Sequence, residues 1–181
     1  MSFNRKTIAL IIIACLCTII ISVRSAISSK IVFCDVGQGA ATLLQLGTYQ
    51  IIIDTGPDQR VLSCIGKYIP FFDHAIEVVI ISHNQKDHDG GLRALQKKYK
   101  IEHVYGPSPK ASYISSSQFT EVKNTIELSV KKSMIIMHKA SQSSTNANDS
   151  ANVVTLISPP HIVFLSSDIN GVELKLSLIH I

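Results

Sequence analysis

The sequence predicts an α/β domain that follows an apolar N-terminal segment. Short apolar stretches bounded by turn residues recur along the chain, which is typical of β-strands. Between residues 60 and 105, helical and strand patterns alternate, and this alternation indicates helices packed on a sheet. The chain has 181 residues and shows no internal repeat or linker, so we expect residues 31–181 to form one domain with a substantial core.

Residues 7–23 form an uncharged segment that follows Arg5 and Lys6. As a helix rising about 1.5 Å per residue, this segment just reaches across the apolar part of a bilayer. The core of a signal peptide is usually shorter, about 7 to 15 residues, and Arg24 interrupts the small residues that a cleavage site needs. We therefore predict an uncleaved signal anchor or transmembrane helix within residues 1–30, with the domain outside the cytoplasm. A cleaved signal peptide and a secreted domain are the alternative.

The charge balance of the domain argues against a surface that binds nucleic acid over its whole extent. The chain has 17 basic and 13 acidic residues, which gives a net charge of +4. Residues 1–30 contain four of the basic residues and no acidic one, so the remaining chain is balanced. A local basic patch remains open around Lys97, Lys98 and Lys100, or at Lys131 and Lys132.

Two cysteines of the domain could form a disulfide. Cys34 and Cys64 are the candidates, because Cys15 and Cys17 lie inside the apolar segment. Cys34 falls at the end of an expected strand, where a buried free thiol is the favoured state. The spacing contains no CxxC pair of the kind that binds zinc.

The local patterns predict the elements of the domain in order. Strands are expected at residues 30–34, 40–46, 49–53, 78–81, 101–105 and 133–138, and a hairpin at 153–157 and 162–165. Helices are expected at residues 60–68 and 92–99, and a helix plus loop within 112–129. Residues 35–39 are expected to form a tight turn, and residues 141–150 a loop.

Histidine and aspartate are concentrated in the stretch SHNQKDHDGG, residues 82–91, directly after an apolar strand. His83 follows the strand, and Asp87 and His88 lie in the next turn, so an imidazole and a carboxylate could share one centre. Gly90 and Gly91 would let the backbone bend tightly and approach a ligand. Imidazole with carboxylate suits Zn, Mn or Fe. Taken alone, such a stretch is more often a polar turn after a strand than a metal site.

Two further aspartates favour the metal interpretation. Asp54 ends a strand within Asp-Thr-Gly, and Asp168 follows another strand. Carboxylates that gather at one edge of a sheet repel one another and are costly to desolvate. A divalent cation would neutralise them, so we predict a metal site there.

Three stretches, FCDVGQGAATLL, IIIDTGP and VVIISHNQKDHDGGL, occur in this order, and weaker similarity continues in NDSANVV and VFLSSD. Together they resemble the metallo-β-lactamase superfamily, and most closely the extracytoplasmic domain of ComEC-type competence proteins. The similarity covers about residues 31 to 175. It implies an αββα sandwich with a metal centre between the sheets, and a hydrolase that cleaves a phosphodiester of DNA during DNA uptake.

The resemblance also implies roles for single residues. His83 would serve one metal position, Asp87 and His88 a second, and Asp168 would bridge the two. Asp54 would orient a ligand by hydrogen bonding, and we count it with Asp87 as a candidate catalytic residue. The metal would activate water for hydrolysis.

Four departures from the family pattern limit this assignment. Gln85 stands where the family has His or Asp, Ala40 replaces an acidic residue, and Ser167 replaces a glycine. The chain ends at Ile181, before the family's last histidine motif, so we expect a domain that is incomplete at its C-terminus. The remaining donors predict one weakly to moderately bound ion per chain, with zinc favoured and manganese as the alternative. The rival hypothesis is a binding module or truncated remnant of the same fold, which would hold DNA at the membrane without cleaving it.

Overall fold

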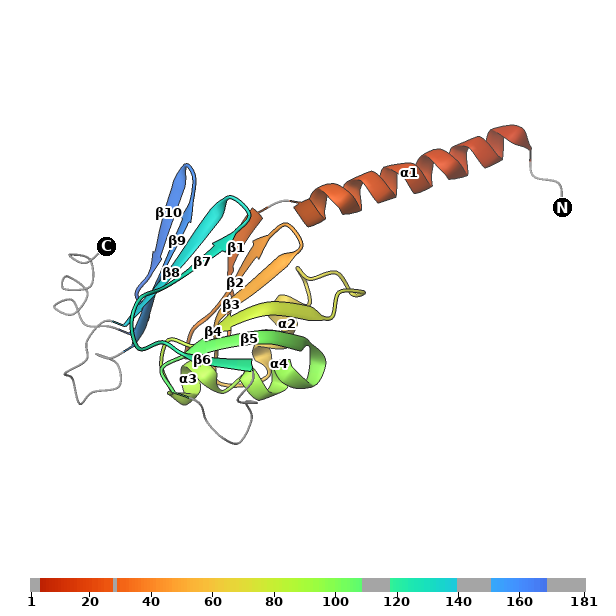
Figure 1. The fold of residues 1–181 in the computed structure, drawn as a ribbon. Helices are drawn as coiled ribbons and strands as arrows, with labels where there is room; N and C mark the ends of the chain where they lie inside the picture. Colours follow the sequence, from red (N-terminus) through yellow and green to blue (C-terminus); the bar gives the residue numbers. More distant parts are fainter. Residues whose placement is uncertain (1–3, 28, 109–117, 140–150, 169–181) are drawn as a thin grey trace.

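Two β-sheets form the body of the computed structural model, which describes residues 4–27, 29–108, 118–139 and 151–168 (Figure 1). The six-stranded sheet has the order β1 (Ser29–Phe33), β2 (Ala41–Leu46), β3 (Tyr49–Thr55), β4 (Ala75–Ile80), β5 (Lys100–Gly106) and β6 (Phe119–Glu121). The four-stranded sheet has the order β10 (His161–Leu165), β9 (Asn152–Ser158), β8 (Ser133–Lys139) and β7 (Ile126–Val130). The helices are α1 (Arg5–Ile27), α2 (Arg60–Ile65), α3 (Lys86–Asp89) and α4 (Leu92–Lys98).

The six-stranded sheet is buried on both faces, and strand β3 shows why. Ile52 faces a core cluster that it shares with residues of α2 and α4. Its neighbours Ile51 and Ile53 point the opposite way, into a second cluster that also contains residues of the four-stranded sheet. Alternate residues of a strand face opposite sides, so a strand covered on both sides must be apolar throughout. The isoleucine-rich sequence of β3 therefore specifies a central strand.

The expected αββα sandwich is present in part. Helices α2 and α4 cover one face of the six-stranded sheet, and the two sheets enclose the second core cluster (Figure 1). Among the described residues, no helix forms a fourth layer over the other sheet. Residues 169–181, with the expected chain end, lie outside the described ranges.

The strand directions decide where polar side chains can gather. Strands β3, β4 and β5 run parallel to one another. Their carboxyl ends therefore share one edge of the sheet, which is where open α/β sheets usually hold ligands. The segments after β3 and β4 contain Asp54 to Gly56 and Ser82 to His88, so the candidate site forms at this edge.

The expectation of a helix within residues 112–129 is wrong for its described part. Residues 118–130 contain β6 and β7, while residues 109–117 lie outside the described ranges. In β7, Ile126, Leu128 and Val130 pack against the second core cluster, whereas Glu127 and Ser129 between them are exposed. This period of two is the signature of a half-buried strand, and the polar residues around it concealed the pattern.

Cys34 and Cys64 form a disulfide, which corrects the expectation of a buried free thiol. Strand β1 ends at Phe33, so Cys34 lies just beyond it and faces α2 with a Cα–Cα distance of 5.7 Å. Closing a loop of this length is worth about 3 to 4 kcal/mol in the unfolded-state entropy model. The bond fixes the start of the 35–39 loop to α2.

The apolar N-terminal segment forms α1, with exposed side chains that include Leu10, Ile12 and Leu16. The expected membrane-spanning segment is nevertheless not confirmed: within the described residues, no helix combines the length and the apolarity that crossing a bilayer requires.

Candidate metal centre

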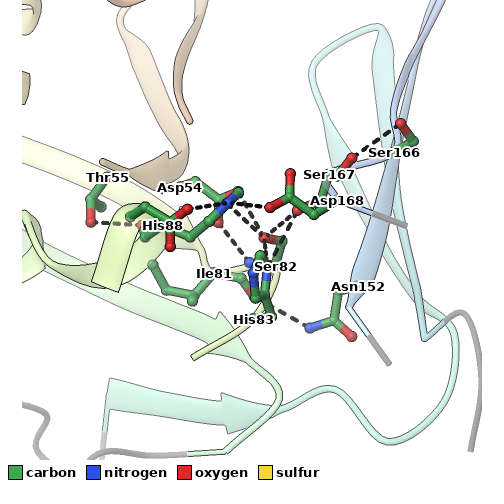
Figure 2. Close-up of polar contacts among 11 residues, drawn as sticks. Asp54, Thr55, Ile81, Ser82, His83, His88, Asn152, Ser166, Ser167 and Asp168 are labelled. Carbon is green, nitrogen blue, oxygen red and sulfur yellow. Dashed lines mark hydrogen bonds and ion pairs between the residues drawn. The ribbon is translucent and has the colours of Figure 1, made fainter. Parts of the chain in front are cut away.

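Side chains from four parts of the chain meet at the carboxyl edge of the six-stranded sheet (Figure 2). Asp54 lies near the end of β3, and His83 follows β4 after two residues. Helix α3 carries His88, and Asp168 follows β10, so the four-stranded sheet contributes as well. The site therefore depends on both sheets.

Asp54 is buried, with 2 % of its surface exposed, and both oxygens of its carboxylate accept hydrogen bonds. Oδ1 accepts a hydrogen bond from the Ser82 backbone N–H at 2.8 Å. Oδ2 accepts from the Ser82 hydroxyl at 2.7 Å and from Nδ1 of His88 at 2.8 Å. The residue has a φ of 56°, a left-handed conformation that aspartate tolerates better than most residues. Asp54 thus positions His88 and has no free oxygen for a substrate.

Ser82 connects the two histidines. Because its hydroxyl donates to Asp54, it accepts hydrogen bonds from Nδ1 of His83 at 3.0 Å and from the Ser167 hydroxyl at 2.8 Å. This network assigns the proton of each neutral imidazole to Nδ1. The Nε2 lone pair of each ring is then the one available to a ligand.

The two Nε2 atoms and one carboxylate oxygen form a compact donor set. The ligand atoms of His83, His88 and Asp168 lie within 4.8 Å of one another. Nε2 of His88 is 3.2 Å from Oδ2 of Asp168, whereas Nε2 of His83 is buried without a hydrogen-bond partner among the described residues. A buried polar atom without a partner is costly, and a cation would satisfy this one. Two imidazoles and a carboxylate fit a divalent ion such as zinc, manganese or iron.

The surroundings shift the pKa values of the two histidines in opposite directions. Burial, and then the neighbouring charge of His88, lower the pKa of His83, so its ring favours the neutral form that binds metals. Burial also acts to lower the pKa of His88, but the hydrogen bond that its ring donates to Asp54 and the nearby carboxylates outweigh it, and the pKa of His88 is raised. The acidic surroundings therefore favour positive charge at His88, and a cation bound to the neutral ring would supply that charge in place of the ring's second proton.

Asp87 stands at the rim of this group. Its Oδ2 is 3.7 Å from Nε2 of His88, and the side chain is 42 % exposed. It lines an open pocket of about 440 Å³ together with Gln38, His88 and Asp168. Of the four metal ligands predicted from sequence, the structure gathers His83, His88 and Asp168 and places Asp87 beside them.

Gly39 and Gly91 hold the segments of the site close together. A Cβ at Gly39 would lie 2.1 Å from the Asp87 carbonyl oxygen, and Gly39 has a φ of 126°. A Cβ at Gly91 would lie 2.2 Å from the Thr55 carbonyl oxygen. The glycines after His88 therefore permit close backbone packing against the end of β3, and Gly91 itself does not need an unusual bend, since its φ is −79°.

Sequence reasoning did not identify Ser82 or Asn152 as site residues. Asn152 is fully buried; its backbone N–H donates to the Ser82 carbonyl at 2.8 Å, and its side-chain amide donates to the Ile81 carbonyl at 3.3 Å. These bonds join the two sheets behind the histidines. The only sequence signal for Ser82 was its place between a buried strand and His83.

Ser167 explains how the site tolerates a residue other than glycine before Asp168. Its φ of 52° is left-handed, a conformation that glycine adopts most easily. The hydroxyl that glycine lacks donates to Ser82. The strained position is therefore part of the hydrogen-bond network.

Comparison with known proteins identifies the family and the fold. Residues 34–136 match the family described as the metallo-beta-lactamase superfamily. No curated protein matches the chain in sequence. Among solved structures, the Rm3 metallo-beta-lactamase aligns with a TM-score of 0.55 and 16 % identity, covering 76 % of this chain and 58 % of that one. The metallo-beta-lactamase fold protein YhfI from Bacillus subtilis aligns with a TM-score of 0.54 and 17 % identity, covering 76 % and 62 %.

A third structure, described as a peroxy diiron species of the chemotaxis sensor ODP, aligns with a TM-score of 0.56 and 16 % identity, covering 72 % of this chain and 55 % of that one. The chain thus spans less than two thirds of the length of each of these three structures. At this level of identity, the similarity shows the fold.

Proposed function

Because the chain belongs to the metallo-beta-lactamase superfamily, we propose that it is a metal-dependent hydrolase with its centre at His83, His88 and Asp168. One observation carries this proposal: Nε2 of His83 is buried without a hydrogen-bond partner among the described residues, in a group of donor atoms no more than 4.8 Å apart. Without a cation, this buried nitrogen would lack the polar partner that buried polar atoms normally have.

The residues of the centre have separate tasks in this proposal. His83, His88 and Asp168 would hold the ion, which when bound supplies Lewis acidity and makes water more acidic. Asp54 and Ser82 fix the two rings, so they are positioning residues. Asp87, whose carboxylate reaches the open pocket, would accept a proton from the attacking water.

One ion per chain is proposed, with zinc favoured and manganese as the alternative. Gln85 carries a neutral amide where the family pattern has His or Asp, and an anionic or imidazole ligand at that position would serve a second ion. Metal analysis of purified protein is expected to give about one equivalent per chain. Two equivalents would contradict this part of the proposal.

A phosphodiester is the proposed substrate class, and a basic groove next to the site supports it. Arg60, Arg93, Lys97 and Lys98 line an open groove of about 670 Å³ between α2 and α4. Its one acidic lining residue is Asp58, which pairs with Arg60 at 3.0 Å. Polyanions bind such surfaces by displacing counterions.

The groove continues towards the metal centre. The Arg60 guanidinium lies against the backbone of Gly37, and the neighbouring Gln38 and Gly39 line the pocket that contains Asp87 and Asp168. A nucleic-acid strand bound in the groove could therefore reach the centre. The finer proposal is a DNA phosphodiesterase of the ComEC type acting in DNA uptake, for which the Asp35–Gly39 sequence is the support.

A nuclease assay tests the proposal. Single-stranded and double-stranded DNA are incubated with the protein and added Mn²⁺ or Zn²⁺, with Glu102→Ala as the matched control for Asp87→Ala, because Glu102 is an exposed acidic residue on β5. Cleavage is expected in the parent and the control and is expected to fall at least about 100-fold in Asp87→Ala, the usual scale for one acid–base group. Equal cleavage in all three would refute the role of Asp87.

A binding module is the second candidate function. The four basic side chains of the groove favour it independently of any chemistry at the centre. DNA binding without metal-dependent cleavage would select this candidate, and the binding should weaken steeply with salt.

Placement of the domain outside the cytoplasm, attached through residues 7–23, is also proposed. The Cys34–Cys64 disulfide supports it, because such bonds persist in oxidising compartments and are rare in the cytosol of most organisms. Secretion after signal cleavage remains the alternative. Mass measurement of the mature protein from its native membrane or medium would distinguish the two.

A further inference from the structure

The edge of the domain opposite the candidate metal centre exposes aromatic side chains. Strands β1, β3, β4 and β5 all begin at this edge, because β1 and β3 are each antiparallel to β2 and the other strands run parallel to β3. The loop that enters β4 contains Phe71, 90 % exposed, and Phe72, 70 % exposed, with their rings 5.4 Å apart. Tyr68 is 38 % exposed nearby in sequence.

This loop is held firmly, so the fold itself presents the two rings outward. The Asp73 carboxylate accepts a hydrogen bond from the Ala75 backbone N–H at 3.1 Å and from the side-chain amide of Gln50 at 3.0 Å. Gln50 is fully buried in β3. The Asp73 backbone N–H donates to the Pro70 carbonyl at 2.9 Å, which closes the turn around Phe71 and Phe72.

Lysines lie at the same edge of the domain as the aromatic loop. The Lys30 ammonium lies 5.2 Å from the centre of the Tyr68 ring. The Lys131 ammonium donates to the Leu46 carbonyl at 2.7 Å, which places the β7–β8 turn at the same edge. The lysines of this edge are Lys30, Lys67, Lys100, Lys131 and Lys132.

The carboxylates of this edge do not cancel these charges. Asp73 and Glu77 accept hydrogen bonds from neutral amide groups of Gln50, which do not offset the charge of a carboxylate, and Glu102 is a third, exposed acid near the start of β5. Against these three acids stand the five lysines, so positive charge remains in excess among the described residues of this edge. The edge therefore combines exposed aromatic rings with excess positive charge.

An anionic lipid surface fits this combination. Aromatic rings enter the boundary between headgroups and acyl chains, while lysines contact the anionic headgroups. Helix α1, with its exposed apolar side chains, joins β1 at the same edge, and Figure 1 shows it on the side of the domain away from α3. We propose that this edge is the membrane-facing surface of the domain and lies on an anionic bilayer through Phe71 and Phe72. The metal centre then faces the aqueous phase. This proposal is independent of the hydrolase proposal.

Single-tryptophan fluorescence of the full chain tests the orientation, because the sequence contains no tryptophan. Phe72→Trp reports on the proposed surface. Phe33→Trp is the matched control, because Phe33 is 68 % exposed and lies at the end of β1, beside the opposite edge. Vesicles contain phosphatidylcholine with or without phosphatidylglycerol, and a brominated lipid serves as quencher.

The proposal predicts a blue shift and strong quenching for tryptophan at position 72 with anionic vesicles, and neither change at position 33. Equal responses at both positions, or no response at position 72, would overturn it. These readouts do not depend on metal binding or on cleavage, so they fail or succeed separately from the proposed function.

Charge substitution gives a second test. Phe71→Asp with Phe72→Asp is expected to weaken binding to anionic vesicles by about tenfold or more, since burial of one phenylalanine corresponds to at least that factor. Phe33→Asp is expected to leave binding unchanged. If the double variant instead lowers the apparent mass in solution and leaves vesicle binding intact, the surface joins two copies of the chain and the membrane proposal is wrong.

Discussion

The histidine side and the carboxylate side of the candidate centre are held in different ways. The histidine side consists of Asp54, Ser82, His83 and His88, and each is at most 2 % exposed. The carboxylate side consists of Asp87 and Asp168, whose side chains are 42 % and 45 % exposed.

This difference shows which part of the site the fold prepares in advance. On the histidine side, every hydrogen bond around Asp54 is between buried groups, so the rings are oriented before any ion arrives. On the carboxylate side, water competes for the same oxygens, and an ion would have to fix their positions. We therefore expect substitutions on the two sides to affect different quantities.

The largest expected effect is on the free energy of unfolding, which should fall for a substitution on the histidine side and hardly change for one on the carboxylate side. Asp54→Ala should lower the free energy of unfolding by about 3 to 5 kcal/mol, because it leaves buried donors of Ser82 and His88 without a partner. Asp168→Ala should change it by less than about 0.5 kcal/mol, as for most exposed positions. Urea denaturation of both variants in chelator measures the difference. Equal losses would show that the two sides are held alike.

The next effect tests whether the histidine side is preorganised through Ser82. Ser82→Ala removes the acceptor for His83 Nδ1, so metal affinity should fall about 10- to 100-fold, the usual effect of losing a group that orients a ligand. Ser166→Ala is the control, because that hydroxyl contacts only the Ser167 carbonyl at 3.4 Å in the described hydrogen bonds. Titration with Zn²⁺ measures both. An unchanged affinity in Ser82→Ala would mean that packing alone orients the rings.

The smallest expected effect is a gain in metal affinity from a substitution at Gln85. Gln85→Asp should raise metal affinity about tenfold, because an anionic ligand gains roughly 1.5 kcal/mol over a neutral one. Gln59→Asp adds the same charge at an exposed position and is expected to leave affinity unchanged. The same Zn²⁺ titration compares them. No gain in Gln85→Asp would count against the family-based assignment of this position.

Much of the fold could be predicted because its signals are local. The apolar runs of β3 and β4 and the alternation of helix and strand between residues 60 and 105 depend only on near neighbours. Strand β7 was missed because Glu127 and Ser129 made its segment resemble a loop, although Leu128 between them is partly buried. For Cys34 and Cys64 the sequence offered a disulfide but favoured a buried free thiol, because the bond depends on how β1 ends against α2, a contact between residues 30 positions apart.

The sequence by itself determined the apolar strands of the six-stranded sheet, the concentration of His83, Asp87 and His88 after one of them, and the balanced charge of residues 31–181. Only the tertiary structure decided that Ser82 links both histidines, that Asp54 has no free oxygen, and that Asp168 comes within 3.2 Å of His88. The physical reason is distance along the chain. Side-chain chemistry and hydrophobic periodicity are properties of residues that are close in the sequence, whereas a coordination sphere depends on where the ends of distant strands meet.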